Sequence, residues 1–213
     1  MRCVSTPPYD LALRLTSDQV SFFHSNYASA SSSTASFDSQ VANDAYAAAG
    51  QDYVTITSLA VRQAFGATQL CGTEQETYMF LKEIASDGDT NTVDVIFPLH
   101  PIILYTNPAL LKLLLEPLFI NQAAGQYPEL FALHDLGAYP NATGYPDGGA
   151  EEQPLEECGN MLIMTLAYAQ RTGDTAFLKQ YYSLLNQWTQ FLIEESLYPQ
   201  NQLSTDDFIG ATP

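Results

Sequence analysis

Hydrophobic and polar residues follow a helical spacing from residue 38 onward, and the first such stretch predicts two paired helices. Asp38 is placed to cap a first helix, which ends at Gly50. Asp52 is placed to cap a second helix, which ends at Gly66. Because only a short polar turn separates the two, we expect an antiparallel helical hairpin.

Further helices are predicted in the second half of the chain. The helix over 107–125 begins with an Asn-Pro pair, a typical helix start. The helix over 155–171 has an interior that is apolar on all sides, so we expect it to be buried. Gly173 ends it, and Asp174 is placed to cap the next helix. That last helix has a one-sided apolar stripe of Phe177, Tyr181, Leu184, Trp188 and Phe191.

Other segments lack this pattern. Residues 1–24 and the Ser/Ala-rich stretch 28–37 are expected to form an irregular lead-in and a linker. Residues 77–84 are rich in aromatic and β-branched residues and predict a short strand. Residues 93–101 contain two prolines and are expected to be irregular. Residues 127–149 are rich in Gly, Pro, Asp and Asn, which predicts a long ordered loop.

These elements predict a mainly α-helical fold with one or two short strands. Helical hairpins in series, with long loops at one end, favour an α/α toroid. The sequence shows no clear repeat, so a plain helical bundle explains the same pattern.

Composition excludes several classes of function. Hydrophobic residues make up 46% of the chain, which predicts a packed core. The chain has 24 acidic and 7 basic residues and a formal charge of -17, so it should repel nucleic acids and anionic membranes. Apolar runs are too short for a membrane-spanning helix. Residues 1–15 lack the apolar core of a signal peptide, so the protein is either cytosolic or begins further upstream.

Sequence motifs for a metal or an organic cofactor are not apparent. Cys3, Cys71 and Cys158 are odd in number and widely spaced, without a metal-binding pattern. No phosphate-binding glycine loop, zinc spacing or Ser-His-Asp arrangement is apparent. We therefore expect no metal and no cofactor.

The first candidate site is the pair His134 and Asp135, in a loop rich in Gly and Pro. Such a pair can act as a general base, a ligand or a clamp for substrate. Asp135 can equally satisfy the backbone amides of its own loop.

The second candidate site is an acidic run whose members repel one another, which raises some of their pKa values. It comprises Glu151, Glu152, Glu156 and Glu157. Glu156 and Glu157 fall in the first turn of the helix over 155–171, where the helix dipole also favours them without any catalytic role. Asn160 follows closely and can orient an amide. Cys158 is better explained as a buried structural residue than as a nucleophile.

A third candidate is the pair Asp206 and Asp207, although Thr205 and Asp206 can equally cap a following helix. Asn141 lies in an Asn-Ala-Thr sequon and would be glycosylated if the protein is secreted.

Four segments, at 80–119, 134–144, 151–170 and 201–208, resemble the fungal glutaminase A family in sequence and in order. The resemblance implies a six-hairpin (α/α)6 toroid, of which residues 38–213 would be the first part. Residues 1–37 would then be the end of a preceding region. The resemblance also implies an enzyme that hydrolyses L-glutamine to L-glutamate and ammonia, extracellular or bound to the cell wall in its full-length form.

The matched polar residues lead to a hypothesis of carboxylate-assisted hydrolysis. Glu156, Glu157 or Asp207 would deprotonate water, and a second carboxylate would protonate the leaving ammonia. His134, Asp135, Asn160 and Asp206 would bind the substrate, with Asp135 on its α-ammonium group. A glycoside hydrolase on the same fold, or an inactive fragment with a binding role, would explain the same pattern.

Overall fold

The computed structural model describes residues 16–73, 75–83 and 88–198, so Cys3, Asp206 and Asp207 lie outside the described residues. Its elements, in chain order, are α1 (Thr16–Ala49), α2 (Gln51–Ala67), β1 (Thr68–Gly72), β2 (Thr77–Leu81), α3 (Val93–Thr106), α4 (Ala109–Ala123), α5 (Pro154–Thr172), α6 (Thr175–Gln180) and α7 (Tyr182–Glu195). The expected mainly helical fold is confirmed.

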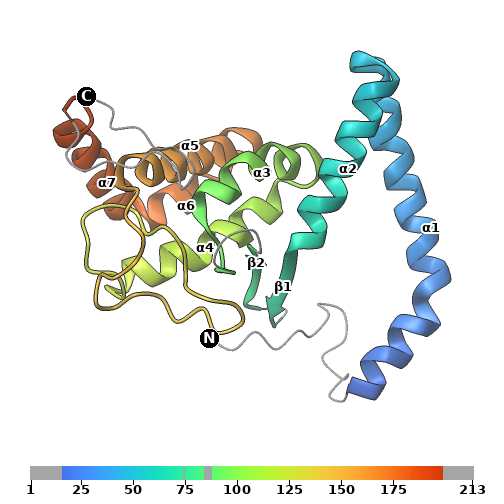
Figure 1. Cartoon of the computed structure of the whole chain (residues 1–213), viewed down its shortest axis with the longest axis horizontal. Coiled ribbons are helices and arrows are strands. Elements are labelled where there is room, and N and C mark those ends of the chain that lie inside the picture. Colours follow the sequence, from blue (N-terminus) through green and yellow to red (C-terminus); the bar gives the residue numbers. More distant parts are fainter. Residues whose placement is uncertain (1–15, 74, 84–87, 199–213) are drawn as a thin grey trace.

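Helices α1 and α2 form the predicted hairpin, which projects from the remaining helices (Figure 1). Gly50 separates them in a left-handed conformation, with φ of 79°. The irregular structure expected at 1–24 is wrong for residues 16–24, and the linker expected at 28–37 is wrong in secondary structure, because both stretches belong to α1. Asp38 therefore lies inside this helix and does not cap it. Alanine favours helix, and hydroxyl groups here bond back to the preceding turn, as Thr34 Oγ1 does to the carbonyl of Ala30 at 3.0 Å. The division of the chain at residues 37 and 38 stays a prediction.

The predicted strand at 77–84 is confirmed as β2. It pairs antiparallel with β1, an element not expected from the sequence, and Leu70 lies opposite Met79. The β1–β2 hairpin connects α2 to the remaining helices, and β2 packs against α4.

The irregular structure expected at 93–101 is wrong, because this stretch forms most of α3. Pro98 and Pro101 remove N–H donors from the helix interior. Because Pro101 has no N–H, it cannot donate the usual helical hydrogen bond to the carbonyl of Phe97. This carbonyl contacts the ring Nδ1 of His100 instead. Burial of one helix face offsets the lost backbone bonds, and this face comprises Val93, Ile96, Leu99 and Ile103.

Helices α4 to α7 pack around an aromatic cluster. The ring of Phe119 stacks on Tyr181 with centroids 4.6 Å apart and lies 5.3 Å from Trp188. The predicted α5 is confirmed, but its expected burial on all sides is wrong, since Ile163 and Leu166 are 52% and 51% exposed.

The long loop predicted at 127–149 is confirmed and runs along one end of the helical layer, drawn in yellow in Figure 1. Among the described residues, we find no helix with the length and apolar character needed to cross a membrane.

Candidate active site

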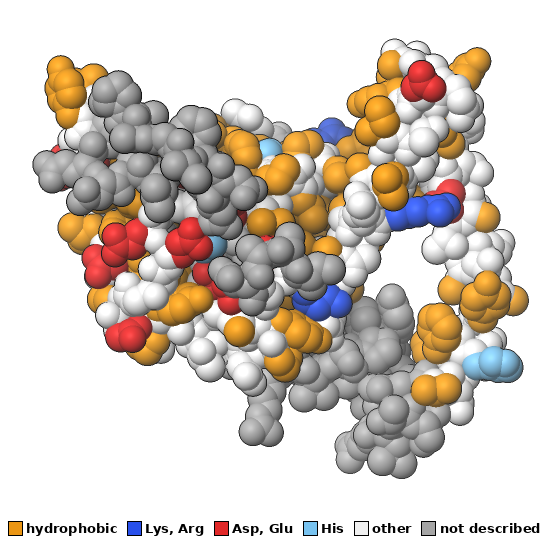
Figure 2. All heavy atoms as spheres, viewed as in Figure 1, with side chains coloured by type: hydrophobic (Ala, Val, Ile, Leu, Met, Phe, Trp, Pro, Cys, Tyr) orange, Lys and Arg blue, Asp and Glu red, His pale blue; other side chains and the backbone are white. Residues whose placement is uncertain are grey.

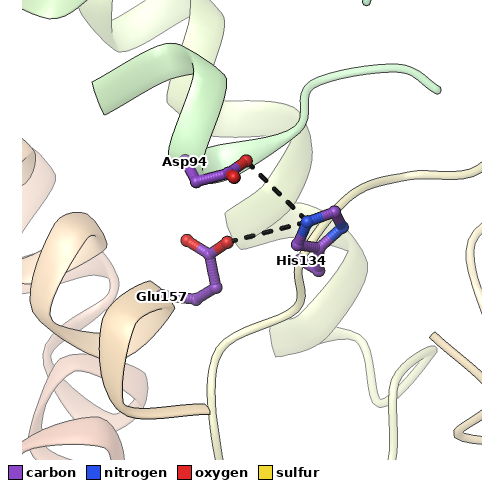
Figure 3. A group of neighbouring side chains, drawn as sticks. All are labelled: Asp94, His134 and Glu157. Carbon is purple, nitrogen blue, oxygen red and sulfur yellow. Dashed lines mark ion pairs between the residues drawn. The ribbon is translucent and has the colours of Figure 1, made fainter. Parts of the chain in front are cut away.

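Three separate segments bring Asp94, His134 and Glu157 together (Figure 3). Asp94 lies in the first turn of α3, His134 in the long loop, and Glu157 in the first turn of α5. His134 Nε2 lies 3.8 Å from Asp94 Oδ1 and 3.9 Å from Glu157 Oε1. The three side chains therefore converge from two helix ends and a loop, and we call them the polar centre.

Backbone hydrogen bonds fix the loop beside α3. The N–H of Val93, the first residue of α3, donates to the carbonyl of His134 at 2.8 Å. Two residues further on, the N–H of Leu136 donates to the carbonyl of Thr90 at 2.8 Å. These bonds place His134 directly next to the turn that carries Asp94.

Gln122 on α4 holds the loop from its other side. Its Oε1 accepts from the N–H of Leu133 at 3.3 Å, and its Nε2 donates to the carbonyl of Phe131. The buried side chain of Gln122 thus satisfies backbone groups of the loop that a neighbouring strand would satisfy in a sheet.

Asp135 orients the imidazole of His134. Nδ1 of His134 donates to Oδ2 of Asp135 at 2.8 Å. The other carboxylate oxygen accepts from the N–H of Gly137 and from the hydroxyl of Tyr145, the latter at 2.8 Å. Gly137 makes this turn with φ of 88°, a conformation that glycine adopts without strain. Both oxygens of Asp135 are thus engaged within the protein, and Nε2 of His134 is directed at the carboxylates of Asp94 and Glu157.

Glu157 is 0% exposed, although it carries a carboxyl group. Its Oε2 accepts from Nδ2 of Asn160, one helical turn later, at 3.3 Å. Within the described part of the chain, Glu157 Oε1 and His134 Nε2 have no hydrogen-bond partner. Two buried polar atoms therefore face each other without the bonds that such atoms usually make.

The surroundings shift the pKa of both groups. Burial alone would lower the pKa of His134, but the hydrogen bond to Asp135 and the charges of Glu157 and Asp94 raise it to about 9. Burial raises the pKa of Glu157 well above its usual value, and His134 opposes this rise. The N-termini of α3 and α5 both lie at the polar centre, where their dipoles favour negative charge.

Glu151 borders the polar centre on a more open side. Its Oε2 lies 4.0 Å from His134 Nε2, and its side chain is 34% exposed. Figure 2 shows acidic side chains gathered over the part of the surface that the long loop occupies. Glu151 is therefore the most exposed of the carboxylates around His134.

The sequence-based candidates are only partly brought together. His134, Asp135, Glu157 and Asn160 form one network. Glu156 is half-buried in the same turn as Glu157, and Asn141 is exposed in the loop. Asp94 is not among the residues that the sequence suggests, and Glu151 is suggested only as a member of the acidic run, without an assigned role. The two prolines in residues 93–101 argue against a helix there, so the sequence does not show that Asp94 lies in the first turn of one.

Cys158 is buried and structural. Its Sγ accepts a hydrogen bond from the N–H of Ala132 at 3.2 Å, and burial raises the pKa of its thiol to about 12. A thiolate nucleophile at this position is therefore disfavoured.

The ligand atoms of Asp94, His134 and Glu157 all lie within 4.8 Å of one another, so these three residues could hold a metal ion. The sequence does not reveal this grouping, because the residues are 40 and 23 positions apart along the chain.

Comparison with known proteins shows clear similarity. The sequence model of the family described as "Glutaminase A six helical-hairpin domain" matches residues 50–213. The chain is 58% identical over 191 residues to the protein named "Glutaminase A" of Aspergillus oryzae, covering 89% of this chain and 28% of that protein. It is 39% identical over 231 aligned positions to a probable glutaminase of Arthroderma benhamiae, covering 82% of this chain and 27% of the relative. The chain thus spans less than a third of either relative, and no solved structure matches it significantly.

Proposed function

Because the chain belongs to the glutaminase A six helical-hairpin family, we propose that it carries the catalytic centre of a glutaminase-like amidohydrolase. The reaction is the hydrolysis of L-glutamine to L-glutamate and ammonia. The names of two relatives support this reaction class. The observation that carries the site is the fully buried Glu157, whose Oε1 faces Nε2 of His134.

In this proposal the polar centre binds the attacking water. Asp94 and Glu157 both face Nε2 of His134, so a water molecule among them would be oriented by three polar groups. The water oxygen attacks the side-chain amide carbon, and the carbon–nitrogen bond then breaks. Glu151 takes the proton from the water and delivers it to the leaving nitrogen.

Other residues support these groups. We assign Asp135 the role of positioning His134. This role takes the place of the expected contact with the α-ammonium group of the substrate, because both carboxylate oxygens of Asp135 are engaged within the loop. Asn160 positions Glu157. Glu156 and Asp207 stay candidates for proton transfer, and Asp206 for substrate binding.

We also propose that the full-length protein is extracellular or bound to the cell wall, as the family resemblance implies. The exposure of Asn141 in its sequon is compatible with glycosylation there.

The test compares Glu157→Gln with Glu152→Gln, a matched substitution at an exposed position in the same acidic run. Ammonia release from L-glutamine should fall about 100-fold or more in Glu157→Gln and stay unchanged in Glu152→Gln. The same pair of substitutions at the aligned positions of the Aspergillus oryzae protein gives a second measurement in a longer chain.

Equal turnover by both variants would remove Glu157 from the reaction. Release of sugar from oligosaccharides, without release of ammonia from glutamine, would instead establish a glycoside hydrolase on this fold.

A further inference from the structure

We propose that Asp94, His134 and Glu157 bind one divalent metal ion. This inference rests on the proposed function, because the ion would act on the same attacking water. It also replaces the sequence-based expectation that the site contains no metal.

The spacing of the ligand atoms fits an ion. Nε2 of His134 lies 3.8 Å and 3.9 Å from the facing oxygens of Asp94 and Glu157. Ligand atoms around a tetrahedral ion at about 2.1 Å lie roughly 3.4 Å apart. The two distances to His134 would therefore need to shorten by about half an ångström. The ligand oxygens of Asp94 and Glu157, which lie within 4.8 Å of each other, would need to approach by at most about 1.4 Å, which rotations of both side chains can supply.

Two buried atoms point to a ligand between these side chains. His134 is 4% exposed and Glu157 is 0% exposed. Nε2 of the first and Oε1 of the second lack a hydrogen-bond partner among the residues that the structure describes. Buried polar atoms are rarely left in this state, and a cation would satisfy Glu157 Oε1 and the lone pair of neutral His134 Nε2 together.

The residues behind the ligands are those that metal sites use. A metal-binding histidine usually donates its second ring N–H to a carboxylate, and Nδ1 of His134 donates to Asp135 at 2.8 Å. A metal-binding carboxylate is usually hydrogen-bonded in turn, and Glu157 accepts from Asn160. Both ligands are thus held in the orientation that coordination requires.

The local charge also favours a cation. Four carboxylates surround a single imidazole, namely those of Asp94, Asp135, Glu151 and Glu157. One imidazole offsets at most one of these negative charges. One nitrogen and two oxygen ligands suit Zn²⁺ or Mn²⁺ better than Mg²⁺ or Ca²⁺, which prefer ligand sets made only of oxygen.

Three protein ligands leave a coordination position for water, as catalytic zinc sites do. A bound ion would lower the pKa of that water, and Glu151 would accept its proton. The ion would thus supply the activation that the proposed hydrolysis needs.

The test uses the metal-stripped chain, titrated with Zn²⁺ or Mn²⁺ by calorimetry, with the bound metal measured by plasma emission. We expect one ion per chain. Asp135→Asn should weaken binding about 10–100-fold, and Glu157→Gln and Asp94→Asn should weaken it further. Glu152→Gln and His24→Gln alter exposed residues and should leave binding unchanged.

Fluorescence of Trp188 shows whether each variant keeps its core, and the absorption of the Co²⁺-loaded wild-type chain reports coordination without any variant. Failure of the wild-type chain to retain an ion would overturn the inference. Equal losses in the ligand and control variants would do so too. Full glutamine turnover without bound metal would reject the ion and keep the proposed function. One bound ion without turnover would reject the proposed function and keep the ion.

Discussion

The backbone N–H of Ala132 donates a hydrogen bond to Sγ of Cys158 across 3.2 Å. This bond joins the loop just before His134 to the helical turn that carries Glu157. Both residues are buried, so an N–H left without an acceptor here would cost about 1–3 kcal/mol.

Substitutions of Cys158 should therefore distinguish the effect on stability of losing the hydrogen-bond acceptor from the effect of changing the side-chain volume. Cys158→Ala and Cys158→Ser leave side chains of similar volume, but the alanine variant has no acceptor, so its free energy of unfolding should fall by about 1–3 kcal/mol more. Cys158→Ser keeps an acceptor and should lose less. Urea unfolding followed by Trp188 fluorescence measures both. An alanine variant as stable as the serine variant would show that the bond to Ala132 contributes nothing.

Asp135→Asn should lower glutamine turnover about 10–100-fold, because it loses the carboxylate that orients His134. The Nδ1 proton signal of His134 in NMR spectra should move upfield, a change that a general loss of stability would not produce. Asp147→Asn, at an exposed position in the same loop, serves as the control. An unchanged Nδ1 signal together with lost turnover would contradict the positioning role.

Tyr168→Phe should destabilise the protein more at neutral pH than at acid pH. The hydroxyl of Tyr168 donates to Asp174 Oδ2 at 2.9 Å, and this bond is the main cause of the lowered pKa of Asp174. A lowered pKa stabilises the folded protein above the ordinary carboxyl pKa of about 4, and the effect disappears as pH falls through the folded value.

We expect the melting temperature of Tyr168→Phe to fall by about 2–4 °C at pH 7 and by less at pH 3. Asp174 also accepts from the N–H groups of Ala176 and Phe177 as the cap of α6, and these bonds remain in the variant. Equal losses at both pH values would indicate that the hydroxyl acts only through packing.

Asn141 should carry a glycan when the chain is secreted from a fungal host. Its side chain is exposed, and its N–H closes a turn on the carbonyl of Ala138 at 3.0 Å. Enzymatic deglycosylation should increase the gel mobility of the wild-type chain. Asn141→Gln and Thr143→Ala should show no such increase, since either change destroys the sequon. A wild-type band that does not move would exclude modification at this position.

Local sequence signals were sufficient where a single residue decides the backbone. Gly50 ends α1, and Asp174 caps α6 through two backbone N–H groups. These features depend on local geometry, which the sequence displays directly. Local signals failed where packing decides. Pro98 and Pro101 argue against a helix, yet burial of the opposite residues keeps α3 helical.

The candidate site could be predicted only in part. His134 and Glu157 lie in segments whose composition marks them, but the approach of Asp94 depends on backbone pairing between residues 90 and 136. Such contacts between distant segments have no local signature. The substrate-binding role of Asp135 stays a prediction, and the positioning role that we propose rests on contacts with Gly137 and Tyr145 that become visible only in three dimensions.

The projecting α1–α2 hairpin makes local stability uneven. Helix α1 packs chiefly on α2, while α3 to α5 and α7 pack on one another. Amide protons of α1 should therefore exchange with solvent through small local openings, and those beneath the aromatic cluster only through complete unfolding. Far-UV dichroism counts every helical peptide equally, so it would register fraying of the hairpin while the residues around His134 are still intact.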